Sequence, residues 1–242
     1  NNIMRASGYP GKAMMTTLIT VAVNLVLAPL FIFVFHWGIR GAALATVFAQ
    51  LTGAATAGFH FTKISSFVHF LPGYMKLKKV IIKDIISIGM SQFFILICAS
   101  IVVSIMNLSL RKYGGDYAIG AFGIINSIGN LTVMVVLGFC QGMQPIVGYN
   151  FGAKQIPRVI KTFKLTIIAG TLVTSFGFFL AELLPRLISS AFTNDSILIE
   201  LSTTGMRLTL MMFPLVGFQI VASSFFQSIG NAKISILLSL TR

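Results

Sequence analysis

The sequence has little charge, and negative charge above all. Only five of its 242 residues are Asp or Glu, against 18 Lys or Arg, and charged residues make up 10% of the chain, where soluble domains carry roughly a quarter. Apolar residues make up 56%. The composition excludes an ordinary soluble domain and indicates a membrane protein. The net charge of +13 does not indicate a nucleic-acid partner, because the cations are confined to short runs between uncharged stretches.

Residues that carry catalysis or bind metals are also scarce. Cys98 and Cys140 both lie in apolar stretches, so neither is expected in a disulfide or at a metal. The three histidines stand at scattered segment ends, and no Asp-rich motif is present. A membrane enzyme, which would need clustered carboxylates or a nucleophile beside a base, is therefore not expected. No cofactor is expected either.

Long apolar stretches with little or no charge fill most of the chain. Crossing a bilayer takes about 20 apolar residues in a helix. Six stretches meet that length, and residues 234–240 open a seventh; the six are 13–35, 41–61, 85–110, 117–144, 159–181 and 201–226. The sequence therefore predicts an all-α, polytopic transmembrane helical bundle. Pro145 should kink or end the fourth crossing, residues 111–116 should form a turn, and residues 182–200 a polar connection.

The cations are distributed unequally between the two sides of the predicted bundle. Twelve lie on the side of residues 1–12, 62–84 and 150–164, and four on the other side. Cytoplasmic connections carry the excess of Lys and Arg. The connectors 62–84 and 150–164 are therefore predicted to be cytoplasmic, in a multi-pass protein of the inner or plasma membrane.

Two similar turns suggest an internal repeat. RASGYPGKA at 5–13 and QSIGNAKIS at 227–235 share a small-residue, Gly, Lys pattern, and Gly8 and Gly230 are 222 residues apart. Two halves in the same orientation are typical of transporters built from parallel repeats. We expect a parent of about twelve spans in two six-helix lobes, of which this chain holds the middle. Residues 1–61 would end the first lobe, 62–84 connect the lobes, and 85–242 begin the second.

Polar side chains inside the spans are candidates for a binding cavity, because they are costly in contact with lipid; hydrogen bonding between helices is the alternative. Aromatic and Met side chains could add a wall that attracts cations and adapts to shape, although most must simply face lipid. The predicted cavity residues are Gln92, Phe93, Phe94, Asn126, Asn130, Gln141, Met212 and Gln219. Arg207 should reach the membrane surface or pair with Glu200.

A second group of residues is predicted to shape the backbone. Asn24 and Pro29 lie at the centre of the first crossing, where Pro29 frees the carbonyl of Leu25 and makes either a hinge or a static kink. Gly8, Gly148 and Gly152 are assigned to loop geometry and close helix packing.

Several motifs, in order over nearly the entire chain, resemble the multidrug and toxic compound extrusion (MATE) transporters. These are NNIMRASGYPGKA at 1–13, VAVNLVLAPLFIFVFHWGIRGAALATVFAQ at 21–50, GFCQGMQPIVGYNFGAKQ at 138–155 and SSFFQSIGNAK at 223–233. The resemblance implies two bundles of six helices around a central cavity. It also implies an exporter of lipophilic, often cationic drugs or toxic compounds, driven by inward flow of protons or sodium. It would be a lipid-embedded monomer with no nucleic-acid partner.

One departure from the family concerns the coupling ion. Many relatives carry an acid just before the proline of the fifth helix, where this chain has Ala28. The five acids here lie at or near predicted connections, whereas an intramembrane carboxylate is the usual ion carrier. The carrier is therefore expected outside this chain. A flippase for lipid-linked oligosaccharides, which shares the fold, remains an alternative, but it would need a cationic cavity.

Overall fold

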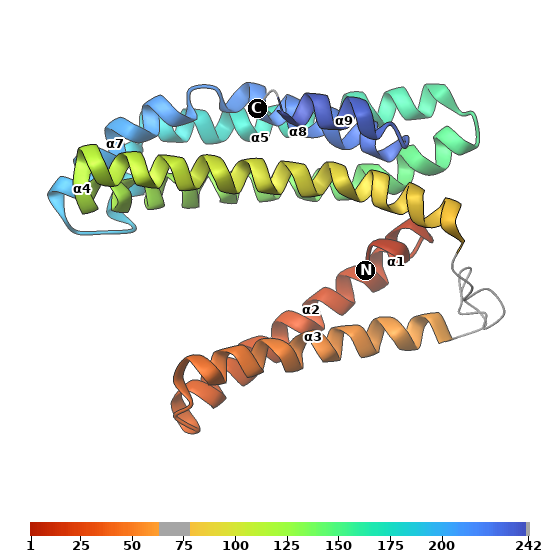
Figure 1. Ribbon diagram of the computed structural model, residues 1–242, viewed down its shortest axis with the longest axis horizontal. Helices are drawn as coiled ribbons and strands as arrows, with labels where there is room; N and C mark the ends of the chain where they lie inside the picture. Colours follow the sequence, from red (N-terminus) through yellow and green to blue (C-terminus); the bar gives the residue numbers. More distant parts are fainter. Residues whose placement is uncertain (63–77, 241–242) are drawn as a thin grey trace. The chain divides into compact units, whose positions relative to one another are not determined.

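The computed structural model describes residues 1–62 and 78–240 (Figure 1), and every element in this part is a helix, joined to the next by a short turn or loop. A few side chains inside the helices, those of Asp84 and Gln92 among them, are not described. The chain divides into two compact units, Asn1–Leu77 and Lys78–Arg242. The all-α prediction is confirmed. The predicted connector 62–84 falls largely outside the described residues, and its last six residues belong to the start of a helix.

Unit 1 is a helical hairpin preceded by one short helix. It consists of α1 (Asn2–Ala6), α2 (Pro10–Pro29), a π-helical segment η1 (Leu30–Val34) and α3 (Gly38–Thr62). Glycines of α3 let it approach η1 and α2: a Cβ on Gly41 would lie 2.8 Å from the carbonyl oxygen of Phe31 in η1, and one on Gly53 would overlap the hydroxyl of Thr20 in α2. Small residues at such contacts are how membrane helices pack. The helices match the first two predicted crossings.

Pro29 does distort its helix. The α-helix ends at Pro29 and five residues of π-helix follow, in which the backbone hydrogen bonds join residues five apart instead of four. Proline explains the change, because it has no N–H to donate to the carbonyl four residues earlier. The structure thus shows a change of helix type after Pro29, while the predicted hinge or static kink stays a prediction.

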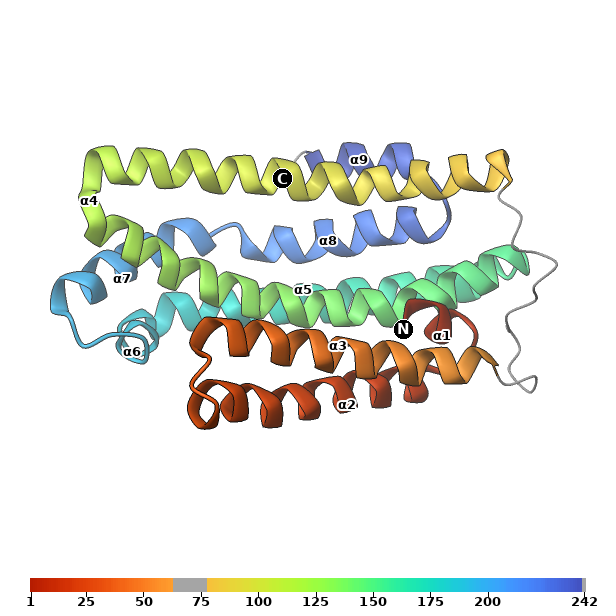
Figure 2. The same cartoon turned by 60° about the horizontal axis from the view of Figure 1, so that its bottom comes forward.

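In unit 2, the long helix α4 (Lys79–Gly152) doubles back on itself (Figures 1 and 2). The fold-back is at Gly115, whose φ of 66° and ψ of −162° interrupt the helix; glycine adopts this conformation without a Cβ penalty. The two limbs are the third and fourth predicted crossings, and the turn lies within 111–116 as expected. Of the two outcomes predicted for Pro145, a kink or an end, the end is wrong, because the second limb continues through Pro145 to Gly152.

The remaining helices of unit 2 are α5 (Ile156–Leu183), α6 (Pro185–Ser190), α7 (Ser196–Leu210), α8 (Phe213–Ser228) and α9 (Ala232–Leu240). The predicted sixth crossing, 201–226, is divided between two helices, since α7 and α8 meet at a 51° bend. Pro214 accounts for the break, because its ring would clash with the carbonyl of Leu210 in a continuous helix. The polar connection is also shorter than 182–200: Glu182 belongs to α5 and Glu200 to α7.

The described residues contain four helices long and apolar enough to cross a membrane, and a fifth span if α7 and α8 are counted as one. One of the four, Leu96–Gly152, has 57 residues, and its fold-back at Gly115 gives it two limbs. The chain is thus a polytopic membrane bundle. The main core of unit 2 lies where the second limb of α4 meets α5 and α8, and is built from Val136, Cys140, Met143, Val147, Val159, Ile220 and Val221.

The repeated turn predicted from the sequence has a repeated geometry. After α1, the N–H of Gly8 bonds to Arg5 O (3.1 Å) and that of Tyr9 to Met4 O (2.9 Å). After α8, the N–H of Gly230 bonds to Gln227 O (3.1 Å) and that of Asn231 to Phe226 O (2.9 Å). Each of these residues stands 222 positions after its counterpart in the first turn. Both glycines have positive φ, 85° and 79°. This pattern is the Schellman motif, a helix end closed by a left-handed residue.

A third copy of this turn joins α4 to α5. The N–H of Lys154 bonds to Phe151 O (3.1 Å) and that of Gln155 to Asn150 O (2.8 Å). Here the left-handed residue is a lysine, with φ of 58°. Three connections thus share one geometry, although only two of them have glycine at the left-handed position.

Candidate functional site

Unit 1 has a polar contact at the centre of its apolar hairpin. The Asn24 side-chain amide of α2 donates to the hydroxyl of Thr46 of α3, at 3.3 Å. Thr46 in turn donates to Ala42 O at 3.0 Å. Asn24 was predicted to act with Pro29 at a hinge. In the structure its side chain, five residues before Pro29, links α2 to α3 through this hydrogen bond.

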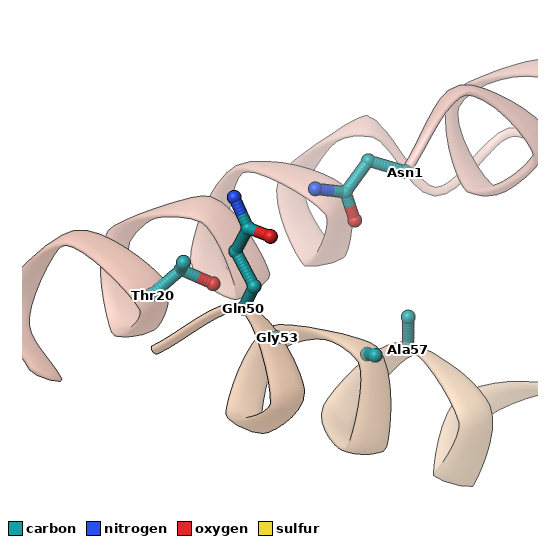
Figure 3. A pocket seen from close by; sticks show the side chains of 6 residues that line it. Asn1, Thr20, Gln50, Gly53 and Ala57 are labelled. Atoms are coloured by element: carbon teal, nitrogen blue, oxygen red, sulfur yellow. The ribbon is translucent and has the colours of Figure 1, made fainter. Parts of the chain in front are cut away.

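A groove runs beside this contact, with a volume of about 270 Å³. Its floor is made of small residues of α3, and its walls carry three polar side chains. The lining is Asn1, Thr20, Gln50, Gly53, Ala54 and Ala57. Figure 3 shows the Gln50 side chain rising from α3 toward α2. Gln50 was not among the residues predicted from the sequence. It is nevertheless a polar side chain inside a predicted span, which is the criterion that selected the other amides.

Unit 2 carries a row of amide side chains on the second limb of α4. At about 100° per residue, Asn126, Asn130, Gln141 and Gln144 fall within about 60° of one another around the helix. Asn130 and Gln141 are exposed, while Asn126 and Gln144 are partly buried. We call these four side chains the amide face. Three of the predicted cavity residues, Asn126, Asn130 and Gln141, thus lie on one face of the second limb of α4, and their role in a cavity stays a prediction.

Other predicted cavity residues are dispersed. Phe93 and Phe94, on the first limb of α4, contact each other edge-on with ring centroids 6.0 Å apart, and both are exposed. Met212 lies at the break between α7 and α8 and is 59% exposed. The Gln219 amide donates to Leu238 O and so links α8 to α9. The side chain of Gln92 lies outside the described residues.

Arg207 pairs with a different acid from the one predicted. Its Nε lies 3.6 Å from Oε1 of Glu182, and its Nη2 donates to the backbone oxygen of Glu182 at 3.3 Å. Glu182 is in the last turn of α5, so the pair joins α5 to α7. Both side chains are about half exposed.

The other carboxylates whose side chains are described stand near helix ends. Asp195 caps α7 by accepting from the N–H of Ile197 at 2.9 Å, Asp116 follows the fold-back glycine, and Glu200 lies early in α7. Among the described residues, no group of three His, Cys, Asp or Glu could hold a metal ion. The side chains of the candidate cavity and of the groove therefore offer a ligand only uncharged groups, namely amides, hydroxyls, aromatic rings and thioethers.

The glycines assigned to loops and packing differ among themselves. Gly8 has the positive φ of a turn residue. A Cβ on Gly148 would touch the carbonyl oxygen of Ser228 at 3.6 Å, which is close packing against α8, whereas Gly152 has open space around it.

Comparisons with known proteins agree with this architecture. The MatE family profile matches residues 91–242. The multidrug export protein MepA of Staphylococcus aureus (strain NCTC 8325 / PS 47) is 27% identical over 236 residues, which cover 95% of this chain and 50% of that protein. MepA of Staphylococcus haemolyticus (strain JCSC1435) is 24% identical over 229 residues, with the same coverage. The chain thus spans about half the length of the curated relatives it matches.

Solved structures show the same fold. An outward-facing multidrug resistance MATE family transporter of the MOP superfamily superposes with a TM-score of 0.89 at 22% identity, over 98% of this chain and 53% of that one. A MATE crystal structure in the straight conformation gives 0.89 at 23% identity, over 99% and 54%. The chain therefore has the helical fold of these MATE structures. The chain belongs to the MatE family. The members named here are transporters, not enzymes.

Proposed function

We propose that the protein containing this chain is a secondary active multidrug efflux transporter. It exports lipophilic or cationic compounds by cation antiport, with alternating access, across an inner or plasma membrane. Residues 62–84 and 150–164 face the cytoplasm, because their side carries the excess of cations. The likeness to MepA, a multidrug export protein, and membership of the MatE family support the activity.

The amide face of α4 is the observation that carries this proposal. Within the described residues, the Asn130 side chain has no hydrogen-bond partner, yet it is exposed halfway along an apolar limb. An amide left unpaired against lipid would cost several kcal/mol, as each unsatisfied polar group does there. The face is therefore directed to a polar or water-filled space, and amide oxygens with nearby Met134 suit a lipophilic cation.

Dye efflux from cells lacking their own exporters tests this function. Asn130→Leu should reduce ethidium efflux several-fold, since it removes an unpaired amide from the cavity wall. The matched control is Ser127→Ala on the same helix, whose hydroxyl already bonds to Gly123 O at 2.9 Å and should be dispensable. Equal efflux by the wild type and Asn130→Leu would remove the amide face from the pathway.

Ion coupling is tested separately in vesicles, by imposing a proton or a sodium gradient and following the dye. Transport against the dye gradient with either ion supports antiport, while passive equilibration would indicate a channel. The coupling carboxylate is proposed to lie outside this chain. The flippase alternative gains no support from the described residues, because Arg207, the cation inside the sixth crossing, is paired with Glu182.

A further inference from the structure

The charged residues of unit 2 are sorted between its two ends. Both ends of α4, the start of α5 and the α8–α9 turn lie together at one end of unit 2 (Figures 1 and 2). This end carries eight cations, namely Lys78, Lys79, Lys83, Lys154, Arg158, Lys161, Lys164 and Lys233. Within the described residues none of these eight forms an ion pair, whereas the ion pair between Arg207 and Glu182 stands at the other end. Among the described side chains, the cations at this end therefore have no acidic partner.

Helix geometry makes this charge costlier. Arg158, Lys161 and Lys164 lie in the first turns of α5, and no acid lies in the first turn of either α4 or α5. A helix N-terminus is itself the positive end of the backbone dipole and favours anions, so cations there are unfavourable unless an anion neutralises them. An anionic partner at this end would remove both penalties.

An apolar groove of about 270 Å³ begins beside these cations. It lies between the second limb of α4 and the start of α5. Its walls include Phe139, Gly142 and Ile146 of α4, and Thr162, Leu165 and Ala169 of α5. Gly142 opens the groove, since a Cβ built there would meet nothing within 4 Å.

The groove walls offer no free polar group to a ligand. The Thr162 hydroxyl donates to Arg158 O at 2.9 Å, and the hydroxyl of Thr166, which also lines the groove, donates to Thr162 O at 2.9 Å. Both are thus satisfied within α5. What remains on the wall is hydrocarbon, which matches the chemistry of an acyl chain.

The mouth of the groove combines cations with an interfacial aromatic. Arg158 precedes Thr162 by one helical turn, about 6 Å along the axis, and so lies on the groove face of α5; Lys161 is one turn before Leu165. On α4, Tyr149 is seven residues after Gly142, on the same face, and is 77% exposed. Tyrosine and basic residues at the end of an apolar wall are typical of the lipid headgroup level.

We propose that the α4–α5 groove is a binding site for an anionic glycerophospholipid. One acyl chain lies against Gly142 and Ile146, and the headgroup phosphate is bound by Arg158 and Lys161 at the N-terminus of α5. The site neutralises the cationic end of unit 2 and rests on the membrane-spanning fold, independently of what the protein transports.

Lipid retention in native mass spectrometry tests the site. The full chain, purified in detergent, is exposed to phosphatidylglycerol or to phosphatidylcholine with the same acyl chains. The wild type should retain phosphatidylglycerol preferentially. Arg158→Gln with Lys161→Gln should weaken that retention about five-fold for each cation removed. The control Arg186→Gln, which removes one cation at the other end of the unit, should leave it unchanged.

A second variant tests the acyl-chain half of the site. Gly142→Leu fills the groove and should reduce retention of both lipids, while Gly123→Leu on the same helix, also into open space, should not. Glycerol phosphate is added as a soluble competitor and should fail to displace the lipid. Equal retention of the two lipids by the wild type would overturn the proposal, as would full retention by Gly142→Leu or displacement by glycerol phosphate. The wild-type comparison needs no variant to fold.

Discussion

Lys154 occupies a backbone conformation that glycine adopts at the two equivalent turns, and this predicts a stabilising substitution. At Gly8 and Gly230 the positive φ carries no Cβ penalty, whereas at Lys154 the same conformation costs an L-residue roughly 1–2 kcal/mol. Replacing Lys154 by Gly removes that cost. The gain is partly offset, because glycine has more freedom to lose on folding, by about 0.4–1 kcal/mol.

The net effect of Lys154→Gly should therefore be a stabilisation of about 0.5–1 kcal/mol. For a chain of this length, 1 kcal/mol moves the melting temperature by roughly 2–4 °C, so the expected rise is about 1–4 °C. Gly8→Ala and Gly230→Ala should act in the opposite direction by a similar amount, since each places a Cβ in the same left-handed turn.

The assay is thermal unfolding in detergent, followed by the helical circular dichroism signal. Lys154→Ala is the control that separates backbone from charge, because it removes the ammonium group but keeps a Cβ at positive φ. Lys154→Gly should melt above Lys154→Ala. If the two melt together, or if Gly8→Ala raises the melting temperature, the turn geometry does not decide the stability of these connections.

Two further predictions concern helix contacts in unit 2. Gly217→Val should destabilise the crossing of α5 and α8 by about 1–3 kcal/mol, because a Cβ there would overlap the Thr174 hydroxyl and lie 2.8 Å from Gly170 O; Thr174→Ala in the same chain should restore part of the melting temperature. Arg207→Gln should cost more than Glu182→Gln, because only the first also removes the bond to the backbone oxygen of Glu182. A double-mutant cycle on melting should give a side-chain coupling below about 1 kcal/mol, as for exposed pairs, and weaker still at high salt.

The order of the long apolar helical segments could be predicted from the sequence because apolar runs and cationic turns alternate along it. The break between α7 and α8 could not be predicted that way. Mean hydropathy over a span does not register a bend, and Met211 and Met212 are as apolar as their neighbours. Pro214 was the available signal. Pro145 shows why such a signal is insufficient, since α4 continues past it to Gly152.

The ion-pair partner of Arg207 was also less predictable from the sequence than the place of Arg207 within a span. The sequence placed Arg207 in a span and Glu200 two turns away, but the chain brings Glu182 to it from α5. Such a contact depends on where the short helix α6 returns the chain, which residue spacing within one helix does not determine. Gln50 was not predicted either. It is a single amide in a crossing rich in Ala, Gly and Thr, so no second polar side chain of its kind marks a polar face there.

The two faces of the second limb of α4 show how much of the candidate site can be predicted from the sequence. Val136, Cys140, Met143 and Val147 recur at helical spacing and form the buried core. The amide face lies about 100° further around the same helix. Both patterns follow from residue spacing alone. What the spacing lacks is the reason one face is covered and the other is not. The small residues Gly170 and Gly217 let α5 and α8 approach the apolar face, whereas within unit 2 no helix covers Asn130 and Gln141 of the amide face, which are exposed.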